Sequence, residues 1–116
     1  MREITINGKN YEIEFGLNAV CLLEDAVHRP LHDIMDSLVA GVVDIRLARA
    51  VFWAGLLANN RGMTLERAGA ILDQADKEYS VVLGTVYGEL LDSFVMRIAP
   101  PEDDKGKKTK NAEGTA

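Results

Sequence analysis

Alternating polar and apolar positions open the chain. Residues 3–6 (EITI) and 11–15 (YEIEF) each show the period-2 pattern of a half-buried β-strand. Residues 7–10 between them, Asn-Gly-Lys-Asn, are typical of a tight turn. The pattern therefore predicts an N-terminal β-hairpin with one apolar face.

The register of this hairpin has two alternatives. A turn at Asn7-Gly8 places Ile6 opposite Lys9, whereas a turn centred one residue later places Ile6 opposite Tyr11. We favour the second register because it pairs apolar residues across one face, although both registers bury the same face. A two-stranded hairpin is only marginally stable in water, so we expect it to pack on helices or to pair with another strand.

Apolar residues at helical spacing follow the hairpin. Cap residues and helix breakers divide this region into five helices, which cover about residues 18–29, 31–40, 45–60, 64–75 and 77–97. The predicted N-caps are Asn18, Asp44 and Thr64. The predicted stops are Pro30, Gly41, Gly62 and Pro100-Pro101.

These elements predict a mainly α (α+β) domain over residues 1–98, with the hairpin followed by a bundle of about five helices around one core. Residues 99–116 hold no large apolar side chain, so we expect a flexible polar tail there. The helix residues expected in the core are Val20, Leu23, Val27, Leu31, Ile34, Met35, Leu38, Leu65, Ala68, Ile71, Leu72, Ala75, Tyr79, Val82, Leu83, Val86, Leu90 and Phe94.

Residues 50–60 (AVFWAGLLANN) hold nine apolar residues in a row, which leave the segment without a polar face. The segment is about half the length that spans a bilayer, so a membrane is the weakest explanation. A central helix that the other helices surround explains the pattern best. Apolar residues off the main stripes are candidates for a partner-binding surface: Trp53, Leu57, Val81, Val95 and Met96.

Composition narrows the range of functions. The chain has 116 residues and a net charge of −5, and the tail from Pro100 nets zero, so the folded part carries the whole charge. This balance argues against nucleic-acid binding, which needs a basic face. The single cysteine excludes an intramolecular disulfide, and the N-terminus has no apolar signal-peptide core. Both features favour a reducing compartment such as the cytosol.

Histidines provide the one candidate metal site. His28 and His32 have the i, i+4 spacing of two ligands on a helix, but Pro30 breaks the helix between them. The acidic residues close to them in sequence are Asp25, Asp33 and Asp36. Since no third ligand follows at a fixed spacing, we expect a polar loop and no metal.

Catalytic motifs are not found in the sequence. The chain has no phosphate-binding loop, no glycine-rich dinucleotide fingerprint and no CxxC pair. Cys21 has the chemistry of a nucleophile, but a lone cysteine on an apolar helix face is expected in the core. We therefore expect an interaction protein without enzymatic activity, cofactor or small-molecule substrate.

The edges of the hairpin leave two interpretations open. One is that a free edge accepts a strand from a partner. The other is that charged residues keep the edges unpaired, namely Glu3, Lys9, Glu12 and Glu14.

Two longer blocks carry a family resemblance. Residues 11–31 (YEIEFGLNAVCLLEDAVHRPL) combine a hairpin strand with a helix of the type F-x-x-N-A-x-C-x-x-E-E. Residues 47–72 (LARAVFWAGLLANNRGMTLERAGAIL) contain a block of the type L-R-A-x-x-W-A-G-L and a cap of the type T-L-E-E-A-G-x-L. Both resemble the tail assembly chaperones of siphovirus-type phages and gene transfer agents, some of which are catalogued as phage tail tube proteins. The resemblance covers residues 4–91, but Arg67 replaces an acid of the pattern and the tail after Pro100 has no counterpart.

The resemblance implies a non-enzymatic role. Such chaperones coat the long helical tape-measure protein of a phage or prophage tail, and keep it soluble in the host cytoplasm until tail-tube subunits polymerise around it. Their N-terminal domain self-associates, and a longer form made by ribosomal frameshifting contacts the tail tube protein. The alternatives are a structural tail component that stays in the virion, and a small metal-dependent enzyme built on His28, His32 and Asp33.

Overall fold

The computed structural model describes residues 1–98, except for the side chains of residue 77 and residues 95–98. The antiparallel strands of the hairpin are β1 (Arg2–Ile6) and β2 (Lys9–Ile13). The helical elements are α1 (Leu17–Val27), α2 (Leu31–Ala40), α3 (Ile45–Leu57), α4 (Leu65–Asp73), the 3₁₀ turn η1 (Asp76–Glu78) and α5 (Tyr79–Ile98). The hairpin and five α-helices confirm the predicted fold class, and the predicted tail, 99–116, lies outside the described residues.

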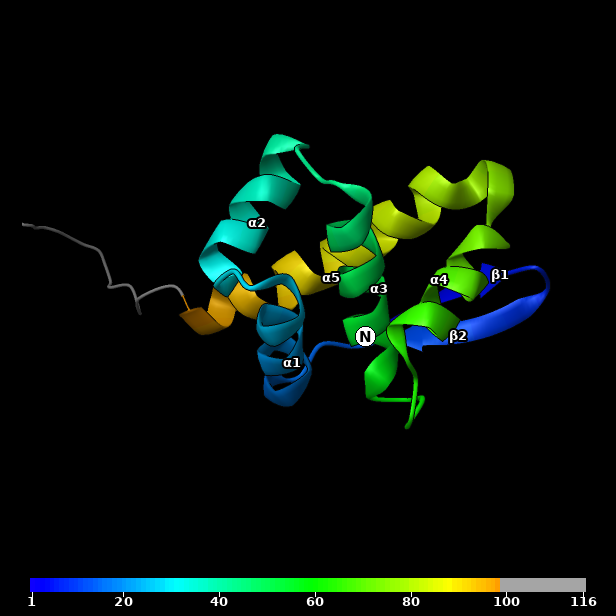
Figure 1. The fold of residues 1–116 in the computed structure, drawn as a ribbon, viewed down its shortest axis with the longest axis horizontal. Helices are drawn as coiled ribbons and strands as arrows, with labels where there is room; N and C mark the ends of the chain where they lie inside the picture. Colours follow the sequence, from blue (N-terminus) through cyan, green and yellow to red (C-terminus); the bar gives the residue numbers. More distant parts are fainter. Residues whose placement is uncertain (99–116) are drawn as a thin grey trace, which may run out of the picture.

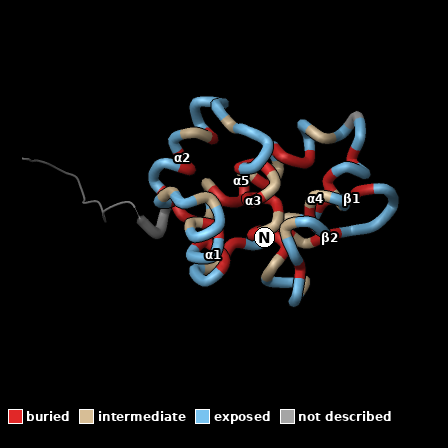
Figure 2. Tube along the Cα trace, in the orientation of Figure 1, coloured by how far each residue is buried: buried red, intermediate tan, exposed pale blue. Residues whose placement is uncertain are grey.

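Helix α3 is the central element of the fold. It contacts α1, α4, α5 and β2. α5 passes behind it, α1 and α2 lie to one side, and α4 and the hairpin lie to the other (Figure 1). Figure 2 shows α3 as largely buried, and its buried residues are Leu47, Ala48, Ala50, Val51, Phe52, Ala54, Gly55 and Leu56. The apolar run at 50–60 is therefore covered mainly by the protein's own elements, as predicted.

The core matches the apolar stripes read from the sequence. The predicted core residues on the helices are buried, except for four that are half-buried against the core: Val27, Leu65, Ile71 and Tyr79. The hairpin adds its inner face, which consists of Ile4, Ile6, Tyr11 and Ile13. No helix within the described residues combines the length and the apolar character that crossing a bilayer requires.

Three of the predicted helix boundaries are confirmed, two by side-chain hydrogen bonds and one by backbone conformation. The Asp44 carboxylate accepts from the Leu47 N–H at 2.8 Å and caps α3. The Thr64 hydroxyl accepts from the Arg67 N–H at 3.1 Å and caps α4 in the same way. Gly41 ends α2 in the left-handed conformation, with φ of 76°, which a glycine adopts without steric cost.

The predicted N-cap of α1 is wrong by two residues. Gly16, not Asn18, holds the N-cap position, and its carbonyl accepts from the Val20 N–H at 3.1 Å. Asn18 lies exposed within the first turn of the helix. The reason is tertiary: the Phe15 side chain is fixed in the core, so the chain has to turn into the helix directly after it.

The end of α3 and the start of α5 also differ from the prediction. α3 ends at Leu57 rather than Asn60: the Leu56 carbonyl accepts from the Asn59 N–H at 3.2 Å and from the Asn60 side chain at 3.0 Å, and not from the Asn60 N–H that would continue the helix. Gly62, with φ of 78°, lies in the following turn rather than at the helix end. The 3₁₀ turn delays α5, which begins at Tyr79 rather than at residue 77.

The favoured hairpin register is wrong, and the alternative is correct. Ile6 lies opposite Lys9, and Ile4 lies opposite Tyr11. Asn7 and Gly8 both have positive φ, 51° and 79°, which is the geometry of a two-residue turn whose twist matches the strands. Since both registers bury the same apolar face, burial did not discriminate between them and the turn geometry decided.

The hairpin meets α3 at Gly55. The Glu14 N–H donates to the Gly55 carbonyl at 3.0 Å, next to the end of β2. A Cβ atom at Gly55 would lie 2.9 Å from Cγ2 of Ile13 and 3.0 Å from Cζ of Phe15. Only a residue without a side chain therefore allows the strand to approach the helix this closely.

A second attachment joins β1 to α5 through charge. The buried Glu89 carboxylate lies 2.9 Å from the Met1 amino group and 3.4 Å from Nε of Arg2. The Ser93 hydroxyl donates to the same carboxylate at 3.0 Å, and Arg2 also pairs with Asp92. The Glu89 charge is thus compensated, as a buried carboxylate requires.

Two glycine substitutions test the contact between the hairpin and α3. Gly55→Ala is expected to lower the free energy of unfolding by about 1–3 kcal/mol, because the added methyl group overlaps two buried side chains. Gly84→Ala, in α5 with open space around it, is the matched control and should raise stability by about 0.5–1 kcal/mol through helix propensity. Urea denaturation measures both. An unchanged or higher stability of Gly55→Ala would contradict the close approach.

Candidate interaction surface

The structure does not bring the five predicted partner residues into one patch. Trp53 and Leu57 lie one turn apart on α3, and both are half-buried against the core. Val81 is 70% exposed in the first turn of α5. This turn lies beside the first turn of α3, because Tyr79 and Ile45, the first residues of the two helices, line one pocket. Leu57 is therefore at the opposite end of α3 from Val81. The side chains of the remaining two candidates, Val95 and Met96, lie outside the described residues.

Trp53 has a structural role in the loop between α3 and α4. Its indole N–H donates to the Met63 carbonyl at 2.9 Å, and Met63 itself is buried. A half-buried tryptophan usually satisfies its one polar group in this way. The bond ties the end of the loop back to α3, so the polar end of Trp53 is engaged within the protein.

A shallow groove lies between the first turns of α1 and the end of α3. We call it the α1–α3 groove, and its volume is about 610 Å³. It is lined by Gly16, Leu17, Asn18, Ala19, Leu22, Leu57, Ala58, Arg61 and Gly62. Leu17 is 67% exposed and Leu22 is 46% exposed, although both are large apolar side chains. Among these described residues the charge is confined to Arg61, so the groove offers mainly apolar contact.

Sequence reasoning identified Leu57 but missed Leu17 and Leu22. The signal was present, because α1 reads LNAVCLLEDAV and its apolar residues occupy more than one face of a helix. Val20 and Leu23 take the face toward the core, which leaves Leu22 to one side of it. The criterion that selected candidates on α3 and α5, an apolar residue off the buried stripe, therefore also selects Leu22 on α1.

The expectation that Cys21 lies in the core is wrong, because its side chain is exposed. Successive residues of a helix are about 100° apart, and Val20 already faces the core. Cys21 is therefore turned away from the buried face of α1. Because the residues next to Cys21 in the sequence are apolar, the sequence alone did not indicate that this position lies on the exposed face.

A second set of exposed apolar residues surrounds the connection between α2 and α3. Val39, Val42 and Ile45 are each more than 70% exposed. Their elements lie at the end of α3 opposite the α1–α3 groove (Figure 1). These side chains give matched controls for substitutions in the groove.

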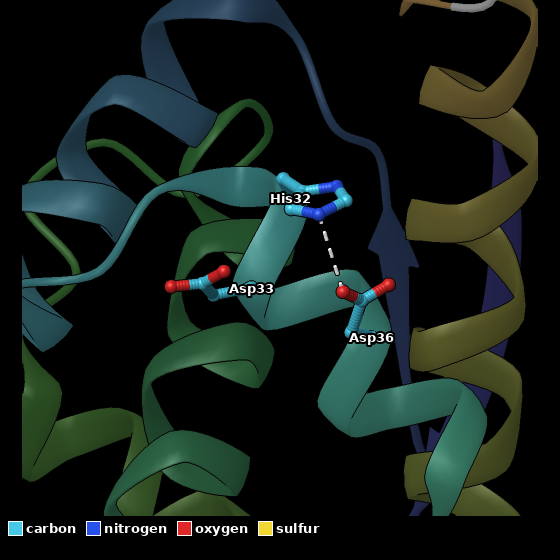
Figure 3. A group of neighbouring side chains, drawn as sticks. All are labelled: His32, Asp33 and Asp36. Atoms are coloured by element: carbon cyan, nitrogen blue, oxygen red, sulfur yellow. Dashed lines mark ion pairs between the residues drawn. The ribbon is translucent and has the colours of Figure 1, made fainter.

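The candidate metal residues are only partly brought together. His32, Asp33 and Asp36 each offer an atom within 4.8 Å of the others, and all three are exposed on α2. Figure 3 shows the His32 ring turned toward Asp36, and Nε2 lies 3.3 Å from the Asp36 carboxylate. His28 ends α1 in the left-handed conformation and is not part of this group. Helical i, i+4 spacing explains the grouping without a metal, and water competes for each exposed ligand atom.

Comparisons with known proteins do not assign the chain to a family. No family model, no curated protein and no solved structure matches the chain. The resemblance to tail assembly chaperones therefore stays a prediction. A function has to be inferred from the groove, the exposed apolar residues and the charge of the chain.

The Tyr87 side chain on α5 has a clearly shifted pKa. Its ring is half-buried on α5. Burial, with the charge of Tyr79 as a second cause, raises the pKa of Tyr87 from 10.0 to about 12. The folded protein therefore holds this proton more tightly than the unfolded chain does.

Substitutions of Trp53 test its structural role. Trp53→Ala should lower the free energy of unfolding by about 3 kcal/mol, because it removes a large side chain that packs on the core. Trp53→Phe keeps a ring but loses the donor to Met63, and should cost about 1 kcal/mol. Thermal and urea denaturation measure both variants. Full stability of Trp53→Ala would instead place this side chain in an interface.

The Tyr87 proton makes stability depend on alkaline pH. Below pH 10 both folded and unfolded chains keep this proton, so it has no effect. Between pH 10 and 12 the unfolded chain releases it first, and the free energy of unfolding falls as the pH rises. Urea denaturation at pH 9.5 and 11.5 should therefore show a smaller fall for Tyr87→Phe than for the parent protein. Equal falls in the two proteins would be inconsistent with this linkage.

Proposed function

We propose that the protein is a non-enzymatic assembly chaperone for the tails of siphovirus-type phages or gene transfer agents. In this role it binds the tape-measure protein in the host cytoplasm and keeps it soluble while the tail tube assembles. The observation that carries the proposal is the α1–α3 groove, where Leu17 and Leu22 stay exposed beside Leu57. The family resemblance of residues 4–91 supports the same role.

The shape of the groove favours a helical occupant. It runs between the ends of two helices, and its lining is mostly leucine, alanine and glycine. An amphipathic helix binds such a site by placing its apolar residues between the helices of the host. The tape-measure protein is the occupant that the resemblance implies, because it is long and helical. We therefore assign the groove to an apolar helix face of that protein.

The charge of the chain supports a solubilising role. The net charge is −5, and the tail after Pro100 contributes none of it. A protein with excess charge repels its copies, so a client coated with acidic domains resists aggregation. The same role includes self-association and contact with the tail tube protein, and it requires neither a catalytic residue nor a cofactor.

Co-expression with the tape-measure protein of the same phage or prophage tests the proposal. The full chain should raise the soluble fraction of the tape-measure protein and co-purify with it. Leu22→Asp should weaken co-purification about tenfold or more, because a buried leucine contributes about 1.5–3 kcal/mol to an interface. Val39→Asp is the control, since Val39 is also an exposed apolar side chain, at 74% against 46% for Leu22, but lies on α2. It should bind like the parent protein.

Two results would contradict the proposal. One is a tape-measure protein whose solubility does not respond to the chain. The other is equal loss of binding in Leu22→Asp and Val39→Asp, with both variants folded by circular dichroism. Mass spectrometry of purified particles separates the alternative role, because a chaperone is absent from them and a structural tail component is retained.

A further inference from the structure

A second pocket lies at the other end of the α1–α3 pair. Its volume is about 320 Å³, and it lies among the end of α1, the start of α3 and the first residue of α4. We call it the arginine pocket. Its lining residues are Ala26, Val27, His28, Arg29, Asp44, Arg46, Leu47, Arg49, Ala50 and Leu65. No residue of the α1–α3 groove belongs to it.

Positive charge gathers in this pocket although the protein is acidic overall. Arg29, Arg46 and Arg49 line it together with His28, whereas the net charge of the chain is −5. The carboxylate in the lining is Asp44, and one of its oxygens is engaged as the cap of α3. The lining therefore includes three arginines and a single acid, although Arg49 also lines a neighbouring pocket with Glu66 and Asp73.

These arginines have no ionic partner within residues 1–98. None of the ion pairs among the described side chains involves Arg29, Arg46 or Arg49. Arg29 donates through Nη2 to the Ser37 hydroxyl at 2.9 Å, and that is a neutral acceptor. The Nε atoms of Arg29 and Arg49 are buried and have no hydrogen-bond partner. Arg29 and Arg49 are half-buried, so these two unsatisfied donors give the site hydrogen-bonding capacity that an anion can use.

Packing also holds Arg49 in place. Its side chain lies across Gly69 of α4, where a Cβ atom would be only 3.1 Å from Cδ of Arg49. The stem of the arginine is thus confined between α3 and α4 before any ligand binds. Confinement of the stem in advance reduces the entropy that this side chain loses when its guanidinium pairs with an oxyanion.

The walls of the pocket define the rest of the ligand. Half of its lining is apolar: Ala26, Val27, Leu47, Ala50 and Leu65. A free phosphate ion would pair with the arginines but would leave these apolar walls uncovered. A carboxylate on an acidic side chain with apolar neighbours matches both parts of the pocket, because arginine binds carboxylates through paired hydrogen bonds. We propose that the arginine pocket binds an acidic side chain within an apolar segment of a partner protein.

A titration followed by ¹H–¹⁵N NMR tests this site on the full chain. The probe is the peptide acetyl-Leu-Glu-Glu-Leu-amide, and the matched probe is acetyl-Leu-Gln-Gln-Leu-amide. The glutamate peptide should shift the amide signals of residues 26–29 and 44–50 and should bind at least about tenfold more tightly than the glutamine peptide, because a charge-assisted hydrogen bond is the stronger one. Inorganic phosphate should bind more weakly than the glutamate peptide.

Matched variants connect binding to the pocket. Arg46→Gln should weaken the glutamate peptide about tenfold, since Arg46 is exposed and its removal disturbs no packing. Arg67→Gln, an exposed arginine on α4 outside the pocket, should bind like the parent protein. Leu22→Asp should also bind normally, so this result is independent of the proposed chaperone role.

Three outcomes would overturn the inference. Equal affinity for the two peptides would mean that the walls bind apolar residues without help from the arginines. Phosphate that binds as tightly as the glutamate peptide would define a small-anion site instead of a site for a partner protein. Equal effects of Arg46→Gln and Arg67→Gln would mean that the peptide is bound by nonspecific attraction to surface charge and not by the pocket.

Discussion

The close approach of the hairpin to α3 at Gly55 is the contact on which the rest of the structure depends. Ile13 and Phe15 occupy the space where any larger residue would place its side chain. The Glu14 N–H bonds to the Gly55 carbonyl at the same point, so backbone and side chains reinforce one another. A lone hairpin is marginally stable in water. The strands are therefore stabilised by this contact and by the ion pair between Arg2 of β1 and the buried Glu89 of α5.

The hairpin contact is one of four that cover α3, which explains why this helix needs no polar face. β2 covers it at Gly55, and α1, α4 and α5 cover its other sides. Helix α1 packs against α3 with its start near the end of α3 and its end near the start of α3. The two ends of this pair therefore differ in chemistry. Exposed leucines lie at one end, and at the other lie arginines that have no ion pair with the side chains described in residues 1–98.

Local patterns predicted much of the fold but little of the candidate surface. Asp44, Thr64 and Gly41 were identified correctly, because each acts through bonds or backbone geometry within a few residues. The core stripes were also recovered, because helical spacing records which face is buried. Leu17, Leu22 and Cys21 were not recognised as exposed, since the sequence of α1 is apolar on more than one face and only its neighbours select the buried one.

By itself the sequence determined the order of strands and helices, the starts of α3 and α4, the end of α2 and the composition of the core, because these follow from local propensity and periodicity. The hairpin register and the end of α3 are set by nearby residues, the Asn7-Gly8 turn and the Asn60 side chain, but the apolar pattern did not reveal them. Only the tertiary structure decided the start of α1 after Phe15 and which faces of α1 stay exposed. It also brought Arg29, Arg46 and Arg49 around one pocket, although α2 separates the first from the other two along the chain. The physical reason is that close packing and charge clustering depend on residues that meet only when the chain has folded.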